Sequence, residues 1–160
     1  MGVPKKMDSE PPLVRRKRPS QVQEGYVALL STADRIKKSF DGILRPFEIT
    51  LQQYNVLRIL RGAGPAGLPT LTIIERMIER TPGITRLVDK LEAKGLIVRK
   101  VSAADRRCVY CQISKKGLQL LKRMDEPMEA GLRFAFRGTA ASDLQQLTSL
   151  LEKARGPHEE

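Results

Sequence analysis

Residues 81–113 read TPGITRLVDKLEAKGLIVRKVSAADRRCVYCQI, and this stretch decides the fold. Apolar residues recur in its first part at the spacing of one helix face: Ile84, Leu87, Val88 and Leu91. The opposite face is polar: Thr85, Arg86, Asp89 and Lys90. Pro82 disfavours helical backbone at Thr81, so we expect Thr81 to be the N-cap, with Arg80 as the alternative. Gly83 would then lie in the first turn, and Gly95 would end the helix.

After Gly95 the pattern changes to that of strands. A short apolar run is made by Leu96, Ile97, Val98 and Val101. Residues 109–113 alternate between apolar and polar, which is typical of a half-buried strand. The polar loop between them carries the adjacent Arg106 and Arg107, and Asp105 is suited to holding one guanidinium in a fixed orientation. A helix followed by such a hairpin predicts a winged helix-turn-helix, a fold that binds duplex DNA.

Further helices are predicted on both sides of this unit. Ser20 with Gln23 and Thr50 with Gln53 form capping boxes, which open one helix that ends before Pro46 and another that closes at Gly62. A third helix over residues 70–77 completes the helix-turn-helix.

The last third of the chain also has helical spacing. Ser114 is the expected cap of its first helix, which Pro127 should bend or interrupt. Thr139 or Ser142 is the expected start of the final helix.

These elements predict a mainly α (α+β) chain with a single domain over residues 20–155. Residues 50–113 form the winged helix-turn-helix, and residues 20–45 and 114–155 form long helices with much apolar surface. We expect these long helices to form a dimer interface, with an ordinary intrachain core as the alternative. Residues 1–19 are a basic arm expected to be disordered, either a solubilising tail or a phosphate-binding arm, and residues 156–160 are a polar tail.

Composition limits the class of protein. The 160 residues contain 29 Lys and Arg against 18 Asp and Glu, a formal charge of +11 that favours a polyanionic partner such as DNA. No apolar run is long enough for a membrane span, and no secretion signal follows the basic arm. Two cysteines without a disulfide framework fit a reducing cytoplasm. His158 is the only histidine and lies in the polar tail, so we expect no catalysis, no metal site and no cofactor.

The ordered set ITRLVDKLEAKGLIVRK (84–100), ADRR (104–107) and ISKKG (113–117) resembles the MarR family of transcriptional regulators. The resemblance extends more loosely from about residue 20 to residue 155. It departs from the common pattern at residues 78–80, where relatives more often have a glycine-containing turn and a serine cap. The resemblance implies a homodimer that binds a pseudo-palindromic operator, usually represses transcription, and in many members is released by a small aromatic or anionic ligand or by an oxidant.

Specific residues are expected to contact DNA. The groove-facing set is Thr81, Pro82, Gly83, Thr85 and Arg86. Arg86 is the expected base reader, since a guanidinium grips guanine bidentately, unless it pairs internally with Asp89 or Glu92. Lys90 should contact phosphate, and Arg106 or Arg107 the minor groove. The alternative function is a non-specific architectural DNA-binding protein, for which the positive charge would suffice.

Effector and redox roles are less constrained by the residues. The position of the ligand cleft in relatives points to Tyr26, Arg45 and Tyr54, each equally explicable by core or surface packing. Cys108 and Cys111 lie three residues apart on a strand, so their thiols point to opposite faces and are poorly placed for a mutual disulfide. Structural or incidental cysteines are the main interpretation, with oxidant sensing through Cys108 as the alternative.

Overall fold

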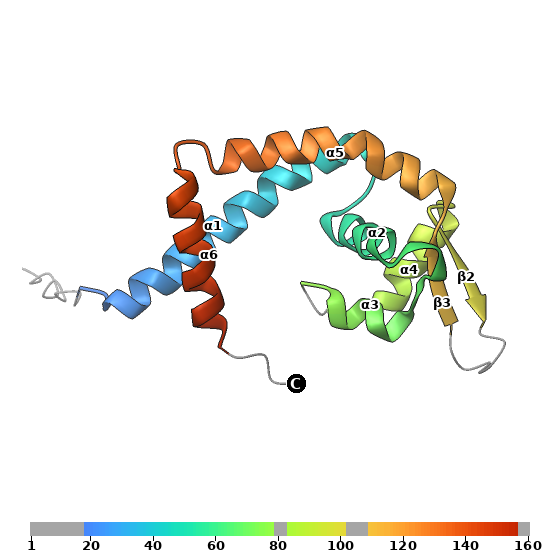
Figure 1. Ribbon diagram of the computed structural model, residues 1–160, viewed down its shortest axis with the longest axis horizontal. Helices are drawn as coiled ribbons and strands as arrows, with labels where there is room; N and C mark the ends of the chain where they lie inside the picture. Colours follow the sequence, from blue (N-terminus) through green and yellow to red (C-terminus); the bar gives the residue numbers. More distant parts are fainter. Residues whose placement is uncertain (1–17, 79–82, 102–108, 157–160) are drawn as a thin grey trace, which may run out of the picture. The chain divides into compact units, whose positions relative to one another are not determined.

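The computed structural model describes residues 18–78, 83–101 and 109–156. The elements, in chain order, are α1 (Gln21–Leu44), the 3-10 turn η1 (Arg45–Phe47), α2 (Leu51–Ala63), the 3-10 turn η2 (Gly64–Ala66), β1 (Leu68–Pro69), α3 (Thr70–Arg76), α4 (Ile84–Ala93), β2 (Ile97–Val101), β3 (Val109–Ile113), α5 (Lys115–Ala135) and α6 (Ala141–Arg155) (Figure 1). The predicted mainly helical fold with a small sheet is confirmed. The chain divides into two compact units after Asp34, within α1.

Side-chain caps begin three of the helices where the sequence predicts them. At α1 the Gln23 amide donates to Ser20 Oγ over 3.3 Å, and the Ser20 amide donates to Gln23 Oε1 over 2.9 Å. At α2 the same reciprocal pair joins Thr50 and Gln53 at 3.2 and 3.0 Å. Ser114 caps α5 by accepting from the Gly117 amide at 3.0 Å. Each cap satisfies backbone donors that a helix start would otherwise leave without a partner.

The start of α4 differs from the prediction. Gly83 occupies the N-cap with a φ of 118°, a left-handed conformation that cannot be part of a right-handed helix. The helix therefore begins at Ile84, and the expected cap at Thr81 is wrong. Gly95, as predicted, ends the helix region in a left-handed conformation with a φ of 68°.

Two predictions in the last third are also corrected. α5 runs without interruption from Lys115 to Ala135 with Pro127 inside it, so of the predicted bend or interruption the interruption does not occur. Pro127 removes a single helical hydrogen bond, and the rest of this long helix remains. α6 begins at Ala141, with Ala140 as an N-cap that makes no side-chain hydrogen bond, so neither Thr139 nor Ser142 is the cap.

The sheet has the order β1-β3-β2, and both pairs are antiparallel. β2 and β3 are in register from Ile97 opposite Ile113 to Val101 opposite Val109. The two-residue β1 was not predicted, and it pairs Leu68 with Cys111. β2 is the outer strand on its side of the sheet.

One hydrophobic core joins the end of α1, α2, α3, α4, the sheet and the first two thirds of α5. Its fully buried large side chains are Leu44, Val56, Leu57, Leu60, Ile73, Val88, Leu91, Ile97, Cys111, Leu121 and Met124. α5 starts close to the sheet, since a Cβ at Gly117 would clash with the carbonyl oxygen of Leu96, just before β2, and with the side chain of Ile113 in β3. The core thus fixes α4 against α2 and the hairpin (Figure 1). In the described part of the chain, no helix combines the length and apolarity needed to cross a membrane.

Candidate nucleic-acid interface

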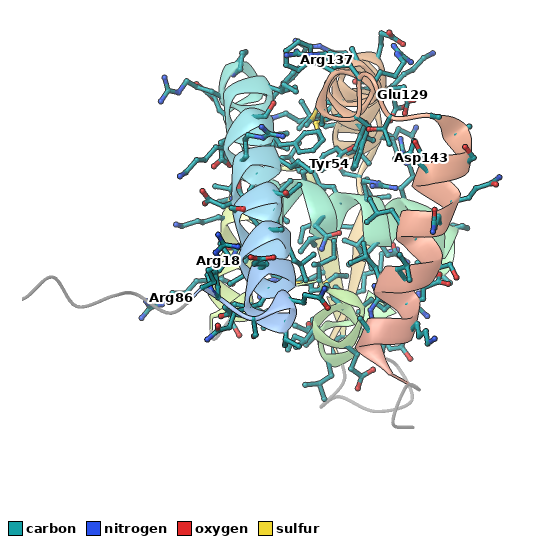
Figure 2. The ribbon with its side chains drawn as sticks, turned by 90° about the vertical axis from the view of Figure 1, so that its left-hand side faces the viewer. Arg18, Tyr54, Arg86, Glu129, Arg137 and Asp143 are labelled. Atoms are coloured by element: carbon teal, nitrogen blue, oxygen red, sulfur yellow. The ribbon has the colours of Figure 1, made fainter. Side chains whose placement is uncertain are left out.

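The helix α4 has one face in the core and one in solvent. Ile84, Val88 and Leu91 are buried, as the apolar spacing predicts. Arg86 and Lys90 are exposed on the other side, and the Arg86 side chain projects from the surface (Figure 2). α4 therefore presents a polar surface from a backbone that the core holds in place.

Arg99, on β2, is tied to the acidic groups of α4. Its Nε donates to Glu92 Oε2 at 2.7 Å, and its Nη2 donates to Asp89 Oδ1. Hydrogen bonding to Asp89 raises the pKa of the Arg99 guanidinium, against the effect of burial, and the bond to Glu92 raises it further. We call these three residues the carboxylate clamp. Sequence reasoning missed Arg99, because only the packing of β2 beside α4 brings it to residues ten and seven positions earlier.

The alternative role of Arg86 as an internal partner of Asp89 or Glu92 is not what the structure contains. Both carboxylates are bound by Arg99, and Arg86 makes no ion pair with any residue that the structure describes. Among the residues that the structure describes, the guanidinium of Arg86 is therefore exposed and not held by either carboxylate of α4.

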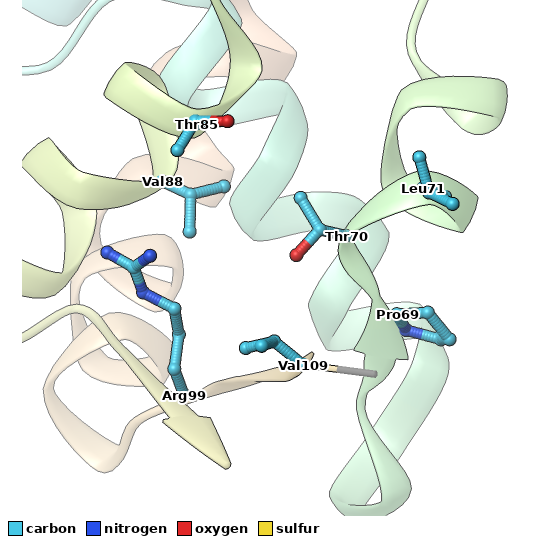
Figure 3. Close-up of a pocket in the computed structure, with 7 residues that line it drawn as sticks. All are labelled: Pro69, Thr70, Leu71, Thr85, Val88, Arg99 and Val109. Carbon is cyan, nitrogen blue, oxygen red and sulfur yellow. The ribbon is translucent and has the colours of Figure 1, made fainter. Parts of the chain in front are cut away.

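A cavity of about 300 Å³ lies beside the clamp, between the start of α3, α4 and the hairpin (Figure 3). It is lined by Pro69, Thr70, Leu71, Thr85, Val88, Arg99 and Val109. The guanidinium of Arg99 reaches across from the strand toward α4 along one wall (Figure 3). Thr85 of α4 and Thr70 of α3 each add a hydroxyl group to the lining of the cavity.

The Cys111 thiol is fully buried in β3, next to Thr70 of this cavity. It shares a hydrogen bond of 3.7 Å with the hydroxyl of Thr70. Burial raises the pKa of Cys111, with Thr70 and Arg99 acting in the opposite direction. Because the thiolate is the reactive form, this environment disfavours nucleophilic chemistry at Cys111. Cys108 lies outside the described residues.

The predicted DNA contacts are only partly within the structure. Gly83, Thr85, Arg86 and Lys90 are all exposed on α4 or at its start. A Cβ at Gly83 would meet no atom within 4 Å, so the approach to this end of the helix is open within the described residues. The remaining predicted contacts, Thr81, Pro82, Arg106 and Arg107, lie outside the described residues, and so does Asp105, which is predicted to support the wing.

A second cavity, of about 490 Å³, lies between α2 and α5. Tyr54 lines it and is buried, with the Arg58 guanidinium 5.9 Å from its ring centre (Figure 2). Burial raises the pKa of Tyr54, and the charge of Arg58 partly opposes this. Arg61, on the same helix, pairs with Asp125 of α5 at 2.9 Å.

The other two predicted ligand residues do not line this cavity. Tyr26 and Arg45 are both exposed. Within the described residues, no three His, Cys, Asp or Glu side chains gather to hold a metal ion.

Comparisons with known proteins agree on one family. The MarR family model matches residues 49–109. The crystal structure of a MarR transcription factor from Planctomyces limnophilus is 38% identical, covers 85% of this chain, is covered over 98% of its own length, and has a TM-score of 0.67. The homoprotocatechuate degradative operon repressor of Escherichia coli is 28% identical over 127 residues, which are 79% of this chain and 84% of the repressor.

A mutant MarR from Escherichia coli complexed with operator DNA has the same fold. Its TM-score is 0.76 at 19% identity, and the match covers 84% of this chain and 95% of that one. At this level of identity the likeness concerns the fold alone.

Proposed function

Because this chain belongs to the MarR family of transcriptional regulators, we propose that it represses transcription by binding a pseudo-palindromic operator as a homodimer. The observation that carries the proposal is Arg86, which is exposed and has no ion pair with a described residue, on a helix whose acidic groups are already bound by Arg99. The name of the Escherichia coli relative, a repressor, and the operator complex of the structural relative support the same function.

In this proposal α4 enters the major groove. The guanidinium of Arg86 binds guanine O6 and N7, a contact that discriminates bases by about 1–3 kcal/mol. Lys90 contacts phosphate, and Thr85 and Gly83 approach the groove edge. Arg106 or Arg107, held by Asp105, contacts the minor groove. Two copies related by a two-fold axis place their α4 helices roughly 10 bp apart, which requires an inverted repeat.

The homodimer is supported by apolar surface that one chain leaves uncovered. α6 has no buried residue, and its Leu147 and Leu150 are 41% and 56% exposed. Leu132 and Phe134, near the end of α5, are exposed as well. A second copy that packs on these helices would remove this surface from water.

We also propose that the cavity between α2 and α5 takes a small aromatic or anionic effector that releases the DNA. Tyr54 offers a ring for stacking, and Arg58 offers positive charge, whereas Arg61 is bound to Asp125. Tyr26 and Arg45 stay predictions for this role. Thermal-shift screening of phenolic acids tests it, with Arg58→Gln expected to weaken any stabilisation that a carboxylate gives to the wild type.

The function itself is tested by selecting bound sequences from a random DNA pool. An inverted repeat should emerge, and the selected site should be preferred over random duplex by on the order of 10³-fold at physiological salt. Arg86→Ala should reduce that preference. Near-equal binding of selected and random DNA would instead indicate the non-specific architectural function.

A further inference from the structure

The charges of α4 cancel within the helix. Arg86 and Lys90 are offset by Asp89 and Glu92, so α4 taken alone has a formal charge of zero. Asp89 follows Arg86 by three residues, a spacing at which opposite charges on a helix surface are neighbours and can pair. An Arg86–Asp89 pair would occupy the guanidinium that the proposed function assigns to base reading.

The structure contains a different pairing. Arg99 crosses from β2 and donates to both carboxylates, to Glu92 at 2.7 Å and to Asp89 by a second nitrogen (Figure 3 shows Arg99). The Arg99 side chain is 27% exposed, against 52% for Asp89 and 41% for Glu92, so the shared cation is the most enclosed member of the clamp. A partly enclosed pair is screened less by salt than a fully solvated one.

Arg99 also suits this role better than a lysine would. A guanidinium offers several donors in a fixed plane, and two of them here bind two different carboxylates at once. An ammonium is a point charge without that fork geometry, so it would hold the two acids less firmly.

We propose that Arg99 is a positioning residue for DNA recognition: it binds Asp89 and Glu92, which leaves Arg86 free to read bases. Arg99 also adds one positive charge beside α4. The formal charge of α4 and Arg99 together is +1, which favours approach to phosphate. This inference rests on the proposed function, since it explains how Arg86 is kept available for the operator.

The test measures base preference, defined as affinity for the selected operator divided by affinity for random duplex. In Arg99→Gln, Asp89 loses its partner and can pair with Arg86, so base preference should fall on the order of 10-fold, toward the value of Arg86→Ala. Adding Asp89→Asn to Arg99→Gln removes the competing carboxylate and should restore base preference to within about 2-fold of the wild type. A purely structural role of Arg99 predicts no such restoration.

Lys100→Gln is the matched control for charge. Lys100 is the exposed neighbour of Arg99 on β2 and has no ion pair within the described ranges. Its loss should weaken binding to all duplexes alike and leave base preference unchanged. Asp89→Asn alone should also leave base preference unchanged, because Asp89 is bound by Arg99 and not by Arg86.

A measurement without DNA separates this inference from the proposed function. The NMR signal of Arg86 Nε should shift in Arg99→Gln and return in Arg99→Gln/Asp89→Asn, even if the wild type lacks base preference and the proposed function fails. An unchanged Arg86 signal and unchanged base preference in folded Arg99→Gln would overturn the inference. If that variant does not fold, Arg99→Lys takes its place and should give an intermediate loss of base preference, whereas wild-type base preference in Arg99→Lys would overturn it.

Discussion

Cys111 places a titratable group in the core beside the candidate interface. Its thiol is fully buried and hydrogen-bonded to the Thr70 hydroxyl, and burial raises the pKa of the thiol. In the unfolded chain the thiol is solvated and ionises near pH 8.5. The folded state thus keeps its proton at a pH where the unfolded state releases it, which links stability to pH.

We expect the stability difference between the wild type and Cys111→Ala to shrink as pH rises from about 7 to about 10. Above about pH 8.5 each pH unit removes up to about 1.4 kcal/mol from the wild-type free energy of unfolding, until the folded thiol itself titrates. Cys111→Ala has lost this group and escapes that decline. Urea unfolding of both proteins across this range checks the prediction, and a difference independent of pH would contradict it.

The sequence predicted which residues of the candidate interface are exposed, but not which of them pair with each other. Thr85, Arg86 and Lys90 could be assigned to the exposed face because helical spacing fixes which side chains oppose a buried stripe. The partner of Asp89 could not be predicted, since the Asp89–Arg99 pair depends on how β2 packs beside α4. The cap at Thr81 was wrong because the left-handed φ of Gly83 depends on the turn before the helix.

Two helices, α1 and α2, begin with the same capping box but differ in how deeply their residues are buried. α2 buries Gln53, Tyr54, Val56, Leu57 and Leu60. The first fifteen residues of α1, in contrast, are all exposed in the described chain. The same local hydrogen bonds therefore support the core in α2 and only a solvated turn in α1.

Thr50→Ala should lower the free energy of unfolding by about 1 kcal/mol, because it leaves the Gln53 amide without its partner at the start of a core helix. Ser20→Ala is the matched control and should lower it by much less, since α1 can fray at that end without exposing the core. Urea unfolding measures both. Equal losses would show that the start of α1 belongs to the same cooperative unit.

Helices and strands were predicted correctly where the apolar pattern of the sequence extends over several residues. The helices α2, α3 and α4 and the strands β2 and β3 follow from apolar spacing and from capping or glycine signals. β1 is too short to carry a two-residue period, and it forms because η2 brings Leu68 beside Cys111. At Gly67 a Cβ would lie 2.4 Å from the Cys111 carbonyl oxygen, a close approach that no local signal predicts.

At the scale of the molecule, the apolar face of α6 is not covered by other parts of the described chain. It repeats leucine at helical spacing, yet none of its residues is buried. Sequence reasoning predicted this apolar surface but could not place a partner, because pairing between copies depends on the shape of both surfaces. The dimer remains a proposal on these grounds.

Leu150→Glu should convert the proposed dimer toward the 18.0 kDa monomer and weaken operator binding, because it places a carboxylate on the apolar face of α6. Ser149→Glu is the control, since residue 149 lies on the opposite side of the same helix and adds the same charge. Light scattering over a range of concentrations measures both. A wild type that is monomeric throughout would contradict the dimer.

The outer position of β2 has a consequence for behaviour at high protein concentration. A free strand edge is a template on which another chain can add, and this edge carries Val98 and Val101 in exposed positions. Lys100 stands between the two valines and is exposed, so an incoming strand would meet its positive charge near the middle of the edge, whereas the charge of Arg99 is bound by Asp89 and Glu92. We therefore expect the strand that supplies the clamp to oppose edge-to-edge aggregation through Lys100.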